Sequence, residues 1–185
     1  MTLDAGSQDE LDNMLEQMAE LVLDAGAMDV LVADTPAKIK DAWAARSSFL
    51  EAIMHETKLL DECDVVVPVN KIADYLDFVN KTGEDCGLVI KSFCHAGDGN
   101  LHIYQCSNDL EEEEFKSRVD KFFEIIYREA TNCGGLVSGE HGIGSGKIKY
   151  LVDSVGETNM ALMEGIKRVF DPKMILNPGK ICYKL

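Results

Sequence analysis

The 185 residues suffice for one domain with a real hydrophobic core but lie near the lower limit for two. Hydrophobic residues make up 46% and charged residues 28%, as in a folded globular protein rather than a disordered one. The net charge of −15 repels nucleic-acid phosphates and anionic lipid surfaces, so neither is expected as a partner. A small anionic substrate would meet the same repulsion, so its binding would need a local cationic side chain.

The cysteine pattern and the N-terminus favour a cytoplasmic protein. The six cysteines form no CxxC pair and no zinc-ribbon spacing, which indicates free thiols in a reducing compartment. The first residues lack the basic and apolar regions of a signal peptide, and no apolar run approaches the roughly 18 residues of a membrane span. We therefore expect neither a leader nor a membrane-spanning helix.

Helical and extended patterns alternate along the chain. Ser7 and Glu10 form a capping box, and Thr35-Pro36 places a proline at a first helical position. In chain order the expected elements are a helix from Ser7 to Gly26, a strand over 29–33, a helix from Thr35 through Leu50, a strand over 64–68, a helix from Asn70 that Gly83 ends, strands over 87–94 and 101–106, a helix containing 115–126 and a helix over 157–170.

The strands over 87–94 and 101–106 have too few residues between them for a crossover helix, so they must pair as an antiparallel hairpin. The expected fold class is therefore α+β. We expect a ferredoxin-like antiparallel sheet with helices on one face, followed by a C-terminal helical segment. No linker or low-complexity tract marks a boundary, so a single domain over residues 1–185 is predicted.

Two histidines, His95 and His102, flank a Gly-Asp-Gly-Asn turn. Their odd spacing would put them on opposite faces of one continuous strand, but a hairpin can bring the two imidazoles together. Two neutral imidazoles and one carboxylate are a usual ligand set for an open catalytic metal site, and Glu140, within the glycine-rich stretch 138–144, is the best third ligand. Zinc, iron and manganese remain open. The opposing interpretation is that the turn residues only form the turn, and that the histidines are core or surface residues whose hydrogen bonds are already made.

Other polar residues suggest roles beside such a metal. His141 could act as a general base that takes the hydroxyl proton of an alcohol being oxidised, or it could be a fourth metal ligand. Arg46, three residues after Trp43, could present a planar fork to a carboxylate, although a lone arginine is more often a surface residue. Lys147 could also meet an anion. No Walker loop, Rossmann fingerprint, HExxH or GxSxG motif occurs, so the chain offers neither a nucleotide site nor a serine nucleophile of its own.

Three spaced motifs stand out: HAGDGNLH over 95–102, EHGIG over 140–144 and DPKMILNPGK over 171–180. Together they resemble the C-terminal domain of FAD-linked oxidases of the vanillyl-alcohol oxidase superfamily, and the likeness covers nearly the whole chain. Within that family the chain is most similar to the D-lactate, glycolate and D-2-hydroxyglutarate dehydrogenase branch, and nearest to lactate dehydrogenases coupled to electron-transferring flavoprotein. The stretches that point to this last group are 32–38, 46–53 and 61–68.

The resemblance implies a reaction and a role for each site residue. A 2-hydroxy acid of the D-lactate or glycolate type would be oxidised to a 2-oxo acid, with hydride transfer to FAD. The implied roles are metal ligation by His95, His102 and Glu140, proton removal by His141, and binding of the substrate carboxylate by Arg46. Asn100 would contact the substrate or a metal-bound oxygen. Enzymes of this family that act on dicarboxylates carry a lysine where this chain has Glu62, so the resemblance disfavours a dicarboxylate substrate.

The family places a FAD-binding domain upstream, and this chain is expected to lack it. FAD would then be bound mainly outside the chain, and the isolated chain would bind a divalent metal and a hydroxy acid without turnover. Two rival functions use the same residues. One is a non-haem iron oxygenase with a two-histidine, one-carboxylate site, and the other is a non-enzymatic, ferredoxin-like module whose histidines respond to metal or pH.

Overall fold

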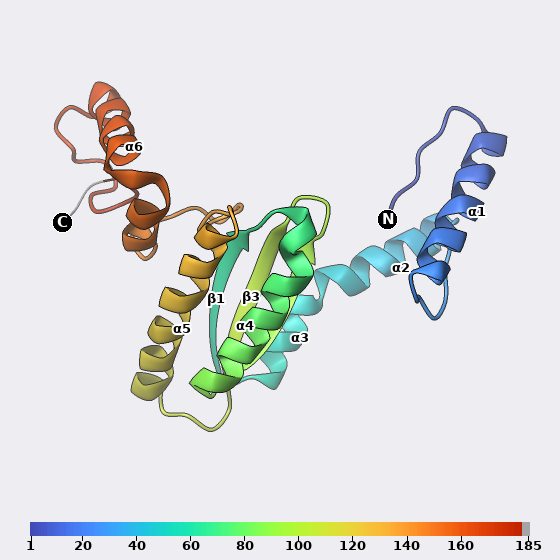
Figure 1. Ribbon diagram of the computed structural model, residues 1–185, viewed down its shortest axis with the longest axis horizontal. Helices are drawn as coiled ribbons and strands as arrows, with labels where there is room; N and C mark the ends of the chain where they lie inside the picture. The colour runs from blue at the N-terminus through green and yellow to red at the C-terminus, as the bar shows by residue number, and fades with distance from the viewer. Residues whose placement is uncertain (183–185) are drawn as a thin grey trace. The chain divides into compact units, whose positions relative to one another are not determined.

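A computed structural model of the chain describes residues 1–182 (Figure 1). The contacts divide the chain into two compact units, Met1–Leu50 and Glu51–Leu185. The first unit is helical, whereas the second contains the sheet and every predicted site residue except Arg46. The single domain expected over the whole chain stays a prediction.

The first two helices begin where the sequence predicts, although the second, which was expected to continue through Leu50, ends at Ser47. Helix α1 (Gln8–Asp24) follows Ser7, whose side chain accepts a hydrogen bond from a backbone N–H of the first turn. Helix α2 (Pro36–Ser47) follows Thr35, which caps it in the same way. The strand expected over 29–33 is wrong. That segment has no regular secondary structure, and none of the residues described up to position 50 forms a strand with which it could pair.

The second unit contains an antiparallel sheet of three strands in the order β1-β3-β2. Its strands are β1 (Leu59–Val66), β2 (Val89–His95) and β3 (Asn100–Ser107), and β2 and β3 form the predicted hairpin. The fold class is α+β, as predicted, and strands and helices alternate as in a ferredoxin-like fold. At the open edge of β1 the described chain adds only an isolated bridge between Val66 and Leu136.

Two helices, α4 (Ile72–Cys86) and α5 (Glu112–Asn132), lie side by side over one face of the sheet (Figure 1). The core between them includes Val65, Val79, Leu101, Ile103, Phe122 and Ile126. Gly83 does not end α4, contrary to expectation, because the helix continues to Cys86 and the left-handed Gly87 ends it. Gly83 instead lets the helix approach the sheet, since a Cβ there would lie 2.1 Å from Cγ1 of Ile90.

The opposite face of the sheet carries polar and aromatic side chains. Alternation along β1 and its register with β3 put Asp64 opposite His102 and Glu62 opposite Tyr104 on this face. Toward one end of the face, Ile53 of α3 (Phe49–Glu56) packs with Tyr104 in a small second hydrophobic cluster. One face of the sheet therefore builds the core, and the other presents the predicted site.

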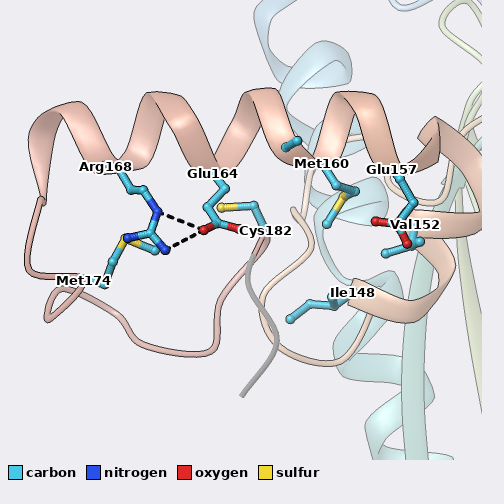
Figure 2. Close-up of a pocket in the computed structure, with 9 residues that line it drawn as sticks. Ile148, Val152, Glu157, Met160, Glu164, Arg168, Met174 and Cys182 are labelled. Carbon is cyan, nitrogen blue, oxygen red and sulfur yellow. Dashed lines mark hydrogen bonds and ion pairs between the residues drawn. The ribbon is translucent and has the colours of Figure 1, made fainter.

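The last helix, α6 (Ile148–Phe170), starts before the predicted range of 157–170, and the two helical parts join at Gly156, whose φ of 78° is not helical. A pocket of about 500 Å³ lies beside α6 (Figure 2). It is lined by Met160, Met174 and Cys182 among others, and by an Arg168 side chain that donates two hydrogen bonds to Glu164. None of the predicted site residues lines this pocket.

All six cysteines are free, as predicted. Burial raises the pKa of the Cys63 thiol to about 12, so this thiol is neutral at physiological pH and serves as a core residue. None of the helices among the described residues is long and apolar enough to cross a membrane.

Candidate metal and substrate site

The β2–β3 hairpin brings His95 and His102 together, as the sequence predicts. His95 ends β2 opposite Asn100, and His102 lies two residues farther along β3 on the same face. The two ring centroids are 5.4 Å apart with the ring planes at 72°. Gly99 permits this turn, because its φ is +74° and a Cβ there would lie 1.9 Å from the carbonyl oxygen of Val67.

The segment 137–141 is anchored to the end of β1. Val66 and Leu136 exchange two backbone hydrogen bonds of 3.1 and 2.9 Å, which fix where the segment begins. Gly139 then lies against the hairpin, since a Cβ at this position would be 2.2 Å from Oδ1 of Asn100. A larger residue here would displace the Asn100 side chain, which accounts for one of the glycines of this stretch.

A buried carboxylate, Asp64, organises the same segment. Its Oδ2 accepts hydrogen bonds from the successive backbone N–H groups of residues 139–141, at 2.7, 2.7 and 3.0 Å. The Ser138 hydroxyl donates to the same carboxylate, and the Lys147 ammonium forms an ion pair with its Oδ1. Sequence reasoning missed Asp64. The available signal was a single acid that opens an otherwise apolar Val-Val-Val run.

The charge of Asp64 is stabilised by these contacts. Burial by itself would raise the pKa of Asp64, but the Lys147 ammonium and the N–H groups of His141 and Glu140 hold that pKa well below its ordinary value. Lys147 is only 15% exposed and also donates to the carbonyl oxygen of Asp64 at 3.1 Å. Its predicted contact with the substrate stays a prediction, because in this structure its ammonium faces Asp64.

The three predicted metal ligands converge. Oε1 of Glu140 lies 2.9 Å from Nε2 of His102 and 3.5 Å from Nε2 of His95. Ligand atoms around a tetrahedral zinc ion are about 3.4 Å apart, so both the donor types and the spacing suit a divalent metal. Burial lowers the pKa of His102, and the neighbouring His141 lowers it further, which outweighs the opposing effect of Glu140. The His102 imidazole is therefore neutral at pH 7 and has a lone pair for a metal.

His141 lies beside the metal ligands and faces a second acid. Its Nδ1 is 3.3 Å from Oε1 of Glu62, and its ring centroid is 5.0 Å from that of His102. The Tyr104 hydroxyl donates to the same Glu62 oxygen at 3.0 Å. Sequence reasoning missed Tyr104 and named Glu62 only through the resemblance. Glu62 lies two residues before Asp64 on β1, and this spacing was the signal that the two acids share a face of the sheet.

The remaining predicted residues have separate surroundings. Asn100 is 7% exposed, and its Oδ1 has no hydrogen-bond partner among the described residues, so a buried acceptor lies at the edge of the site. Arg46 belongs to α2 in the first unit, with its guanidinium 5.5 Å from the ring centroid of Trp43, as their spacing suggested. Its predicted contact with a carboxylate stays a prediction.

The chain is similar to known proteins along nearly its whole length. Residues 1–181 match the family described as FAD linked oxidases, C-terminal domain. The chain is 60% identical over 184 residues to a D-lactate dehydrogenase of Anaerostipes hadrus, covering 100% of this chain and 39% of that protein. It is 32% identical over 181 residues to the glycolate oxidase subunit GlcD of Bacillus subtilis, covering 97% of this chain and 38% of that protein. A D-lactate dehydrogenase of Archaeoglobus fulgidus is 36% identical over 171 residues, or 92% of this chain and 37% of that protein.

Proposed function

The chain belongs to the FAD linked oxidases through their C-terminal domain, and on that premise we propose that it is the metal- and substrate-binding part of a FAD-dependent dehydrogenase. The substrate is a small 2-hydroxy acid of the D-lactate or glycolate type, and the product is a 2-oxo acid. The observation that supports this most is the convergence of His95, His102 and Glu140 beside His141. The names of the relatives support the substrate class.

We propose that His95, His102 and Glu140 hold a divalent metal, which is zinc, iron or manganese. The donor set of two imidazole nitrogens and one carboxylate oxygen fits these ions, and so does the spacing of its atoms. When bound, such an ion polarises the oxygens of a hydroxy acid as a Lewis acid. His95 and Glu140 are partly exposed, so the ligands are accessible from solvent.

His141 is the proposed base. A proton on its Nδ1 faces Glu62, which leaves Nε2 as the nitrogen that can accept the hydroxyl proton of the substrate. The Glu62 carboxylate then stabilises the imidazolium that forms, and the hydrogen bond from Tyr104 keeps this carboxylate in place. Glu62 is thus proposed as the residue that orients the base.

An anionic substrate also needs positive charge and hydrogen-bond donors. We propose that Arg46 and Asn100 contact the substrate carboxylate, with Lys147 as a further candidate. The Lys147 ammonium already compensates the negative charge of the buried Asp64, so that this carboxylate repels an anionic substrate less strongly. The bound metal would offset the charges of Glu140 and Glu62 in the same way.

We propose that FAD, which accepts the hydride from the substrate carbon when bound, is held mainly by protein outside these 185 residues. The chain spans only 37–39% of the three relatives described above. Electron-transferring flavoprotein as the acceptor and a cytoplasmic location stay predictions.

One experiment tests the proposal on the purified chain. Manganese bound at the site should speed the relaxation of the methyl protons of D-lactate, as measured by NMR. The effect should vanish in a variant with both His95→Ala and His102→Ala, and it should persist in His55→Ala, which removes an exposed histidine elsewhere. Equal relaxation in the double variant would contradict the proposal. So would turnover of D-lactate by the chain with an artificial acceptor and no added flavoprotein.

The two-histidine, one-carboxylate set also favours a second candidate, a non-haem iron oxygenase. The same purified chain separates the two functions. Oxygen consumption by the iron-loaded chain in the presence of a 2-oxo acid would favour the oxygenase. We expect none, because the chain is proposed to supply only the substrate side of a flavin reaction.

A further inference from the structure

We propose that the site contains a second, weaker zinc position, formed by Glu62, His102 and His141, and that zinc at this position inhibits the enzyme. His102 is shared: its Nε2 belongs to the first metal position, and its Nδ1 belongs to the second. The inhibition rests on the proposed function, whereas the binding of a second zinc ion does not.

The second donor set matches the first in composition and spacing. Oε1 of Glu62 lies 3.3 Å from Nδ1 of His141 and 3.8 Å from Nδ1 of His102. One ligand atom from each of the three residues lies within 4.8 Å of the others. Because the ligand atoms of a tetrahedral zinc ion are about 3.4 Å apart, an ion would fit between them once the wider separations, which reach at most 4.8 Å, have closed.

An unpartnered buried atom points to the same place. The side chain of His102 is only 7% exposed, and its Nδ1 has no hydrogen-bond partner among residues 1–182. A histidine that binds a metal through one nitrogen almost always donates its other N–H to an acceptor. Here the carboxylate oxygen of Glu62 lies 3.8 Å from Nδ1 of His102, too far for a hydrogen bond. A cation between Nδ1 and Glu62 would give the Nδ1 of His102 the partner that it lacks.

The surroundings hold the second set in place. The Tyr104 hydroxyl donates to Glu62, and the Tyr104 ring stacks on Phe93 with centroids 5.2 Å apart. Phe93 in turn packs against the His102 ring at 5.4 Å. Such supporting contacts orient ligands for metal binding. His141 and Glu62 remain partly exposed, so an ion can enter from solvent.

Occupation of the second position would block the proposed chemistry. The zinc ion would take the Glu62 oxygen that stabilises protonated His141. It would also bind Nδ1 of His141, whose proton would move to Nε2, so that Nε2 could no longer accept the hydroxyl proton of the substrate. With both positions filled, each ring nitrogen of His102 would hold one ion, so the ring N–H proton of His102 would be released to solvent. The need to remove that proton is the reason that the second position binds more weakly than the first.

Zinc titration of the metal-free chain by calorimetry tests the inference, with the far-ultraviolet circular dichroism of each variant as the folding control. We expect one tight and one weak zinc ion, and release of about one proton with the weak ion, as seen by repeating the titration in buffers of different ionisation enthalpy. Glu62→Gln should lose only the weak ion, His95→Ala only the tight one, and His102→Ala both. Glu113→Gln, on an exposed part of α5, should keep both.

A second variant, Tyr104→Phe, tests the same position in case Glu62→Gln does not fold. Tyr104→Phe keeps the Glu62 charge but removes the hydrogen bond that orients it, so it should weaken the second ion by about 10–100-fold and leave the first unchanged. A single zinc ion in the unaltered chain, or a weak ion that survives both substitutions, would overturn the inference. Neither result affects the first metal position, which is tested separately by variants such as His95→Ala that remove a ligand of the first set only.

Discussion

Removal of the Asp64 carboxylate should destabilise the segment that presents Glu140 and His141. In Asp64→Ala the N–H groups of residues 139–141 lose their shared acceptor, and Lys147 keeps its charge on a side chain that is only 15% exposed. The Asp64 side chain itself is fully buried, at 0% exposure. The substitution therefore leaves three partly buried N–H groups and the Lys147 ammonium without their acceptor.

The contacts of Asp64 allow the size of the loss to be worked out. A hydrogen bond to a charged group contributes about 1.5–3 kcal/mol net, and removal of one partner from a buried ion pair costs about 3–5 kcal/mol. These contributions share one carboxylate, so they do not add. We expect Asp64→Ala to lower the free energy of unfolding by about 3–5 kcal/mol, a large part of the 5–15 kcal/mol or so that stabilises a typical domain.

Urea unfolding followed by circular dichroism measures this loss. The matched control is Asp85→Ala, an exposed acid of α4, which should change the free energy of unfolding by less than about 0.5 kcal/mol. In a double-mutant cycle, Asp64→Ala and Lys147→Met should be coupled by about 1–3 kcal/mol. A loss below about 1 kcal/mol for Asp64→Ala, or strict additivity with Lys147→Met, would refute the role assigned to this ion pair.

Three further predictions concern pH and packing. Because the folded state lowers the pKa of Asp64 below its ordinary 3.8, its contribution to stability is present above about pH 4 and is lost as the pH falls. The urea midpoint should therefore fall less steeply below about pH 4 in Asp64→Ala than in the unaltered chain, and parallel curves would speak against this. Gly139→Ala should cost about 1–3 kcal/mol of unfolding free energy and weaken metal binding, because its Cβ would lie 2.2 Å from Oδ1 of Asn100. Unchanged stability and metal binding would disprove that contact. Tyr75→Phe should cost about 1–3 kcal/mol in urea, because it removes the buried donor to the Ile126 carbonyl at 2.8 Å, yet it should leave metal content unchanged. Loss of metal in this variant would be unexpected.

The metal ligands could be predicted because their signals are local. A glycine-rich turn between His95 and His102 predicts a hairpin, and the hairpin determines which residues face one another. The roles of Glu62 and Asp64 could not be predicted in the same way. They depend on the pairing of β1 with β3, strands that are separated by a helix and by β2, and local patterns do not specify that register.

Two incorrect predictions have related physical causes. The apolar run 29–33 has the composition of a strand, but a strand needs a partner, and the described residues 1–50 supply none. Gly83 has the position of a helix end, but glycine also serves where a helix approaches a neighbour closely, as it does here against Ile90. In both cases the local sequence is compatible with two structures, and contacts with other parts of the fold determine which of them forms.

The metal content of the purified chain tests the central claim most directly. After dialysis against metal-free buffer, the chain should retain about one divalent ion, as expected for a site with two histidines and one carboxylate. His95→Ala and Glu140→Gln should each lose this ion, whereas His55→Ala should retain it. Equal metal content in all four proteins, or none in the unaltered chain after loading with zinc, iron or manganese, would contradict the claim that these residues form a metal site.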